Sequence, residues 1–252
     1  MKVGILYCGY NSEEYVYDSL APFVARDDFI ISAVSVPFAE YRNQDPYEDR
    51  TTSILRNYLK KDRIHNLVDF PKFIKEHEAR DLALQFLLQK GVDLIFLVDA
   101  DEIYTDENIE DILTFVKNNE AAWYTVSLKN FVFDKKHYLE EPFSPPRIFR
   151  TKYKQFIHPQ MYWDNDFAYH DIDADKFVTQ NDLPKLDIPK EVAWVDHYTW
   201  LSDNIGKRKV KYQEDRGWEC SYRWNRQEGK LEFNTDFYKN KGVNIPTVLS
   251  LV

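Results

Sequence analysis

The chain has 252 residues, of which 44% are hydrophobic and 30% charged, the proportions of a soluble globular protein with one sizeable core. Its formal net charge of −9 argues against nucleic-acid binding through a basic surface. The two cysteines, Cys8 and Cys220, make neither a disulfide framework nor a CxxC pair, and no segment resembles a signal peptide or a membrane span. We therefore expect a cytoplasmic protein without an integral membrane segment. The sequence leaves its oligomeric state open.

The first elements alternate between strand and helix patterns. Residues 3–7 are apolar and run into Cys8-Gly9, which predicts a buried strand. The stretch Asn-Ser-Glu-Glu at 11–14 is typical of a helix start, and that helix should end near Val24. The patterns that follow predict a strand at 29–36, a helix at 51–59 and a strand at 65–68.

An amphipathic helix is predicted at 75–90, ending at Gly91. Its apolar face is expected to consist of Ala79, Leu82, Ala83, Phe86 and Leu87. Residues 94–98 are apolar without alternation, as in a central parallel strand. This order predicts an α/β fold with a mixed, mainly parallel sheet flanked by helices. Ligands are expected at the carboxyl ends of the strands.

The regular alternation of strand and helix patterns ends after residue 105. Thr105 can cap a helix whose apolar positions are Ile109, Ile112, Leu113 and Val116. Strands are expected at 123–133, 147–150, 155–163 and 192–195, and a basic helix at 201–213, whereas 164–191 shows little periodicity. We expect one domain with two functional halves, at 1–105 and 106–252.

Three acids follow the central strand directly: Asp99, Asp101 and Glu102. Side chains at i and i+2 of an extended chain point to the same side, so Asp99 and Asp101 can face one ion or one ribose–diphosphate. Carboxylates are the ligands that Mg²⁺ or Mn²⁺ takes. The alternative is that the acids merely solvate a strand end.

Residues from other segments are predicted to reach the same edge of the sheet. Gly9 and Asn11 follow the first strand, where they supply a small-residue turn. Trp194-Val-Asp-His197 brings an imidazole to the end of another strand, where it is a candidate third metal ligand.

Two stretches in the first part of the chain carry a resemblance to a known family. They are ILYCGYNSEEYVYDSLAPF (5–23) and HEARDLALQFLLQKGVDLIFLVDADE (77–102). They are similar to the strand ending in Tyr-Asn-x-Glu, the helix and the strand ending in Asp-x-Asp-Glu of the family-2-type GT-A glycosyltransferases. PPRIFR (145–150), FIH (156–158) and DHYTW (196–200) are similar to further stretches of the same family.

The resemblance implies a GT-A, Rossmann-like fold and transfer of a sugar from a nucleoside diphosphate sugar with Mn²⁺ or Mg²⁺. It places Asp99 at the ribose or the ion, and Asp101 on the metal together with His197. The other residues implied to contact the donor are Tyr7, Cys8, Gly9, Asn11, Arg80 and Ala100.

A basic cluster on the predicted helix at 201–213 is a candidate for binding the diphosphate. Lys207, Arg208 and Lys211 would neutralise the charge of the departing diphosphate in an otherwise acidic protein. The alternative is that these side chains form a solvated helix face.

The sequence offers several candidates for the catalytic base. The family's Ile-His-Glu is Ile157-His158-Pro159 here, so the carboxylate of that stretch is missing. An inverting transferase needs a carboxylate to accept the proton of the acceptor hydroxyl. We favour Asp171 over Asp173 and Asp134, because it lies among His170, Tyr169 and Trp163.

The expected function is therefore that of a metal-dependent, inverting glycosyltransferase of hexosyltransferase type. Its acceptor would be the hydroxyl of a glycan or other glycoconjugate. The alternatives are a nucleotidyltransferase of similar fold, a phosphatase of the Asp-x-Asp type and a non-catalytic sugar-nucleotide-binding protein.

Overall fold

The structure is a computed structural model that describes residues 1–37, 49–69, 73–140, 142–163, 166–200, 210–211, 214, 219–225, 228 and 230–251. The chain forms two compact units. Unit 1 comprises Met1–Arg42, Pro46–Ser127 and Ser144–Val195, and unit 2 comprises Asn43–Asp45, Leu128–Phe143 and Asp196–Val252. Unit 1 thus extends well past residue 105.

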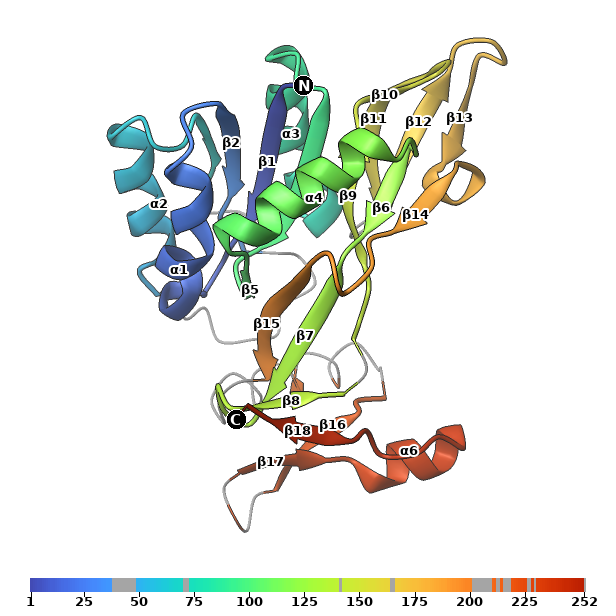
Figure 1. Cartoon of the computed structure of the whole chain (residues 1–252). Coiled ribbons are helices and arrows are strands. Elements are labelled where there is room, and N and C mark those ends of the chain that lie inside the picture. Colours follow the sequence, from blue (N-terminus) through green and yellow to red (C-terminus); the bar gives the residue numbers. More distant parts are fainter. Residues whose placement is uncertain are drawn as a thin grey trace. The chain divides into compact units, whose positions relative to one another are not determined.

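Unit 1 is built on a seven-stranded sheet with the order β14-β6-β9-β4-β1-β2-β3 (Figure 1). The strands are β14 (Lys185–Asp187), β6 (Trp123–Thr125), β9 (Pro146–Arg150), β4 (Leu94–Asp99), β1 (Val3–Cys8), β2 (Phe29–Val34) and β3 (Asn66–Val68). The four strands from β4 to β3 are mutually parallel, β14 is parallel to β6, and β9 is antiparallel to both of its neighbours. The predicted mixed, mainly parallel sheet is confirmed.

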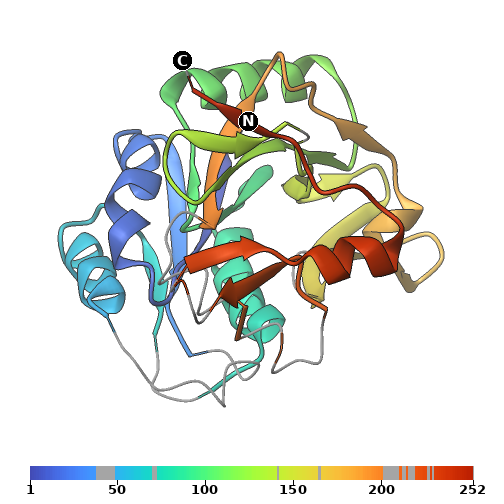
Figure 2. The same ribbon diagram turned by 90° about the horizontal axis from the view of Figure 1, so that it is seen from below.

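Helices cover both faces of this sheet. They are α1 (Glu13–Val24), α2 (Thr51–Lys60), α3 (Glu76–Gln89) and α4 (Asp106–Asn118). Viewed along the strands, α3 and α4 lie on opposite sides (Figure 2). Thr105 caps α4 as predicted, and with Asn108 it forms a reciprocal capping box.

The buried face of α3 differs from the prediction. Leu82 is 48% exposed, whereas Arg80 and Leu84 are buried together with Ala79, Ala83 and Leu87. The reason is that α3 packs against a second sheet as well as against the central one, since Asp81 Oδ1 accepts a hydrogen bond from Met161 N of β11. The buried face of the helix is therefore rotated about the helix axis, relative to the predicted face, by about the angle between successive residues.

The second sheet of unit 1 is antiparallel, with the order β10-β11-β12-β13. Its strands are β10 (Lys152–Tyr153), β11 (Phe156–Trp163), β12 (Asp166–Asp171) and β13 (Lys176–Thr179). The hairpin of β12 and β13 lies in the stretch where the sequence shows little periodicity. Phe167 and Tyr169 of β12 are fully buried against the α3 side of the core.

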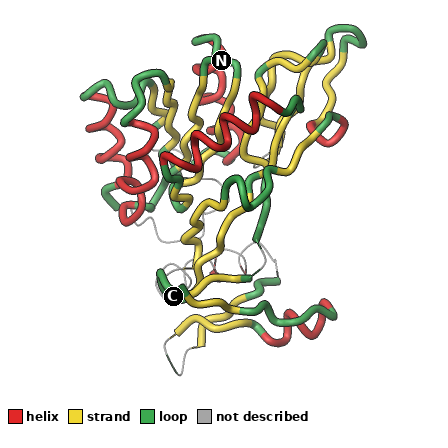
Figure 3. Tube along the Cα trace, in the orientation of Figure 1, coloured by secondary structure: helices red, strands yellow, loops and turns green. Residues whose placement is uncertain are grey.

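Unit 2 is mostly strand, with one helix among its described elements (Figure 3). Its elements are β7 (Ser127–Val132), β8 (His137–Leu139), β15 (Trp194–Trp200), β16 (Tyr222–Asn225), β17 (Lys230–Phe233), α6 (Thr235–Lys241) and β18 (Val248–Ser250). The run 123–133, predicted as one strand, is divided into β6 and β7 at Val126. Only positions 210 and 211 of the predicted basic helix are described.

The described residues contain no helix that is both long enough and apolar enough to span a bilayer.

Candidate functional site

The carboxyl ends of β1 and β4 meet at one edge of the sheet, because the two strands are adjacent and parallel with Cys8 opposite Asp99. Ala100 N donates a hydrogen bond of 2.8 Å to Cys8 O across this edge. A Cβ on Gly9 would lie 3.1 Å from Cβ of Ala100, so glycine permits the close approach of the two segments. The chain after β1 is therefore packed directly against the turn after β4, as predicted.

Asp99 is held between two arginines. Its Oδ1 accepts a hydrogen bond of 2.8 Å from Arg80 Nη2 of α3, and its Oδ2 accepts one of 3.0 Å from Arg147 Nη2 of β9. The side chain of Asp99 is 24% exposed, whereas both arginine side chains are 4% exposed. Strand alternation explains this arrangement, because it places Ile95, Leu97 and Asp99 of β4 on the α3 side.

Arg147 also binds the fully buried Glu102, the first residue of β5 (Glu102–Ile103). Glu102 Oε1 accepts hydrogen bonds from Arg147 Nε and Nη2 at 2.7 and 2.5 Å. Burial lowers the pKa of Arg147, but the charges of Glu102 and Asp99 outweigh it and raise the pKa above its ordinary value. Glu76 of α3 adds a third carboxylate to the network through its ion pair with Arg80.

Asp101 lies in the turn formed by Ala100 and Asp101, between the two acids that Arg147 binds. Its side chain is half-buried. The carboxylates at the two ends of this turn, Asp99 and Glu102, are both bound by Arg147.

The carboxylates at this edge differ in how well they suit a divalent ion. Within the described part of the chain, no group of three or more His, Cys, Asp and Glu side chains could hold a metal. The guanidinium groups on both oxygens of Asp99 oppose a further cation there. Nucleotide sites usually hold Mg²⁺ through one or two carboxylates together with substrate phosphates. Asp101 with phosphate oxygens fits that arrangement, and Asp99 does not.

Tyr7 and Cys8 have buried side chains. Tyr7 has no exposed surface, its hydroxyl lies 2.8 Å from Ser19 Oγ of α1, and its ring lies beside Gly9. Burial raises the pKa of Cys8 to about 12, although the charge of Arg80 opposes this shift. The Cys8 thiol is therefore a neutral core group.

Asn11 is fixed in a left-handed conformation with φ of 53°. Its Oδ1 accepts a hydrogen bond of 3.2 Å from Asp49 N. The carboxylate of Asp49 in turn accepts from Glu13 N and Thr51 N, both at 2.8 Å, which are the first amides of α1 and α2. Asp49 thereby ties the loop after β1 to the start of α2.

The remaining predicted ligands and cations belong to unit 2. His197 Nδ1 lies 2.5 Å from Asn130 Oδ1, so β15 and β7 are joined by this side-chain pair. Lys211 is exposed, and Lys207 and Arg208 lie outside the described residues.

The structure does not bring Asp171 to the edge that carries Asp99. Asp171 Oδ1 accepts hydrogen bonds from the amides of Asp173 and Ala174, at 3.0 and 3.2 Å, and so closes the turn between β12 and β13. Figure 1 shows this turn at the end of unit 1 where β1 begins, opposite the carboxyl ends of the parallel strands. Asp134 likewise accepts from the amides of Lys136 and His137 in a turn of unit 2.

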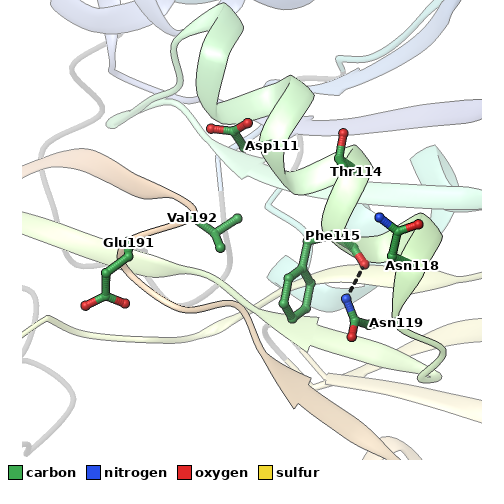
Figure 4. A pocket seen from close by; sticks show the side chains of 7 residues that line it. All are labelled: Asp111, Thr114, Phe115, Asn118, Asn119, Glu191 and Val192. Atoms are coloured by element: carbon green, nitrogen blue, oxygen red, sulfur yellow. Dashed lines mark hydrogen bonds between the residues drawn. The ribbon is translucent and has the colours of Figure 1, made fainter.

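An open pocket of about 370 Å³ lies against the outer face of α4 (Figure 4). It is lined by Asp111, Thr114, Phe115, Asn118, Asn119, Glu191 and Val192. In this pocket Asn119 Nδ2 donates to Phe115 O, so the amide closes the last turn of the helix. The pocket includes none of the predicted site residues.

The sequence patterns indicate no role for Arg147 or Glu76, and they leave the role of Glu102 open. The available signal for Arg147 was the PPRIFR stretch. The sequence patterns also do not single out Asp196 of unit 2. Burial raises the pKa of Asp196, although Lys129 and Tyr198 oppose this shift.

Neither a protein-family model nor a curated protein matches the chain. Among solved structures, it is similar to S. aureus TarS 1-349 in complex with UDP-GlcNAc, with 20% identity and a TM-score of 0.42 over 60% of this chain and 46% of that chain. It is also similar to the inositol-1-phosphate CTP transferase from T. maritima, with 11% identity and a TM-score of 0.37 over 87% of this chain and 98% of that one. The chain thus spans less than half of the length of the TarS structure.

Proposed function

We propose that this chain is a GT-A-type glycosyltransferase that binds a nucleoside diphosphate sugar at the carboxyl ends of β1 and β4. The observation that carries the proposal is the position of Asp99. Its carboxylate is paired with two buried arginines, and it stands beside the Gly9 turn at the edge where parallel sheets generally bind ligands. The resemblance of 5–23 and 77–102 to the family-2 transferases supports the same reading of this edge.

In the proposed site, Asp99 binds hydroxyl groups of the ribose. A carboxylate can accept about four hydrogen bonds. Within the described residues, each oxygen of Asp99 accepts one hydrogen bond from an arginine. The 24% exposed part of the side chain is available to hydroxyl donors, whereas the two adjacent cations disfavour a metal ion at the same oxygens.

Asp101 is the proposed protein ligand of Mn²⁺ or Mg²⁺, together with the phosphate oxygens of the donor. A divalent cation bound there would stabilise the charge that develops on the leaving diphosphate. The reaction proposed is transfer to an acceptor hydroxyl with inversion, as the family resemblance implies.

The test is a thermal-shift and calorimetric panel of UDP, GDP and CDP, their sugars and the corresponding nucleoside triphosphates, each with and without Mn²⁺. Binding to the native state stabilises it by mass action, by about 2.7 kcal/mol at a ligand concentration of 100 Kd. A diphosphate or its sugar should raise the Tm, and more so with Mn²⁺. If only nucleoside triphosphates bind, the chain is a nucleotidyltransferase; if no nucleotide of either kind binds, the proposal is wrong.

A further inference from the structure

Arg147 holds both ends of the turn that carries Asp101. Its Nη2 is shared between Asp99 Oδ2, at 3.0 Å, and Glu102 Oε1, at 2.5 Å. These two acids are the residues on either side of Ala100 and Asp101. One guanidinium group therefore closes the turn from β9, the strand antiparallel to β4.

The environment of this contact leaves little room for rearrangement. Glu102 has no exposed surface, and the Arg147 side chain is 4% exposed and also donates from Nη1 to Pro146 O at 3.0 Å. On the opposite side of the turn, Ala100 N is bonded to Cys8 O and Ala100 packs against Gly9. Between these two fixed sides lies Asp101, whose side chain is half-buried.

We propose that Arg147, together with Glu102, is a positioning residue that fixes the Asp99–Asp101 turn in the geometry that binds the nucleotide diphosphate. The proposal rests on the proposed function for its ligand. Arg147 acts through Asp99 and Asp101 and does not itself contact the donor. A planar guanidinium can donate to two carboxylates in fixed directions, which the single ammonium of a lysine does not reproduce.

Arg147→Lys is the informative variant, because it keeps the positive charge and changes only the geometry. Arg150→Lys is its matched control. Arg150 is on the same strand, and it donates to Ala121 O, Val116 O and Tyr124 Oη rather than to an acid. Both variants should lose stability, so stability alone does not separate the two roles.

The first measurement is amide hydrogen exchange in the peptide covering residues 99–104, without any ligand. Arg147→Lys should speed exchange there by about tenfold, while Arg150→Lys leaves that peptide unchanged. Unchanged exchange in Arg147→Lys would overturn the positioning role, whatever the protein binds. If Arg147→Lys does not fold, Glu102→Gln takes its place, since it removes the negative charge of the other partner and so weakens the same contact.

The second measurement is the Kd of UDP with Mn²⁺, taken well below the Tm of each variant. Arg147→Lys should raise this Kd by about 10- to 100-fold, the range found for residues that orient a ligating carboxylate, and Arg150→Lys should leave it as in the wild type. An equal Kd in all three proteins would overturn the link between the turn and the donor. Wild-type protein that binds no nucleotide would overturn the proposed function, and the exchange result would still decide whether Arg147 fixes the turn.

Discussion

Arg147 Nη2 and Glu102 Oε1 lie 2.5 Å apart in the interior of unit 1, with side chains that are 4% and 0% exposed. The pair is part of a larger network in which two guanidinium groups, Arg80 and Arg147, face three carboxylates, Glu76, Asp99 and Glu102. A buried charge is tolerated only when it is paired and hydrogen-bonded. The charge balance of the edge therefore depends on both arginines.

Replacing Arg147 with methionine should destabilise the protein by about 3–5 kcal/mol, because Glu102 would be left as a buried carboxylate without its cation. The double variant Arg147→Met and Glu102→Leu should regain much of this loss, since it removes both charges. Urea denaturation of the wild type, both single variants and the double variant gives the coupling free energy. Additive losses in the double variant would mean that the two side chains do not stabilise each other.

The substitutions Asp99→Asn and Asp101→Asn are expected to have different effects on stability and on UDP binding. Asp99→Asn removes a carboxylate bonded to two guanidinium groups, so it should lower the free energy of unfolding by about 2 kcal/mol and weaken UDP binding with or without Mn²⁺. Asp101→Asn should abolish only the part of the UDP-induced Tm shift that requires Mn²⁺. An Asp101→Asn protein whose Tm still responds to Mn²⁺ with UDP would place the metal elsewhere.

Asp49 should stabilise two helices at once, because its carboxylate accepts from the first amides of α1 and α2. Asp49→Ala is expected to cost about 2 kcal/mol, at about 1 kcal/mol for each lost cap. Asp49→Asn keeps one acceptor oxygen and should cost about half as much. Urea denaturation followed by far-UV circular dichroism measures both. If Asp49→Ala and Asp49→Asn lowered the free energy of unfolding equally, the two hydrogen bonds of Asp49 would not stabilise the helices independently.

Asp196 should make the stability of the protein fall as the pH rises. Burial raises its folded-state pKa, so the native state keeps a proton over a pH range in which the unfolded state has already lost it. The stability is therefore lost from about pH 4, the pKa of an unfolded Asp, upward through the folded pKa. Asp196→Asn should remove this dependence and become more stable relative to the wild type as the pH rises from about 4.

The check is urea denaturation of both proteins across this pH range, with Asp134→Asn as a comparison of opposite sign. Hydrogen bonding from Lys136 N lowers the pKa of Asp134, so its contribution is present above the unfolded pKa and is lost as the pH falls. Parallel pH profiles for the wild type and Asp196→Asn would contradict the predicted role of burial at Asp196.

The sequence by itself determined the order of the elements from β1 to β4 and the place of the acids at the end of β4. Apolar periodicity and caps are local properties, and they were sufficient for β1, α1, β4 and the Thr105 cap of α4. Because parallel strands in a βαβ order bring their carboxyl ends to one edge, the proximity of Gly9 to Ala100 could be predicted as well.

Only the tertiary structure decided which side chains face each other across that edge. The pairing of Arg147 with Glu102 joins residues 45 positions apart, and an ion pair has no period from which it can be predicted. Similarly, Leu82 lies on the expected apolar face of α3 but is exposed, because the second sheet selects a different face of the helix. The turn role of Asp171 depends on the β12–β13 hairpin, whose pattern is too short to stand out in the sequence. Local patterns thus fix the elements, while long-range packing and charge pairing fix the site.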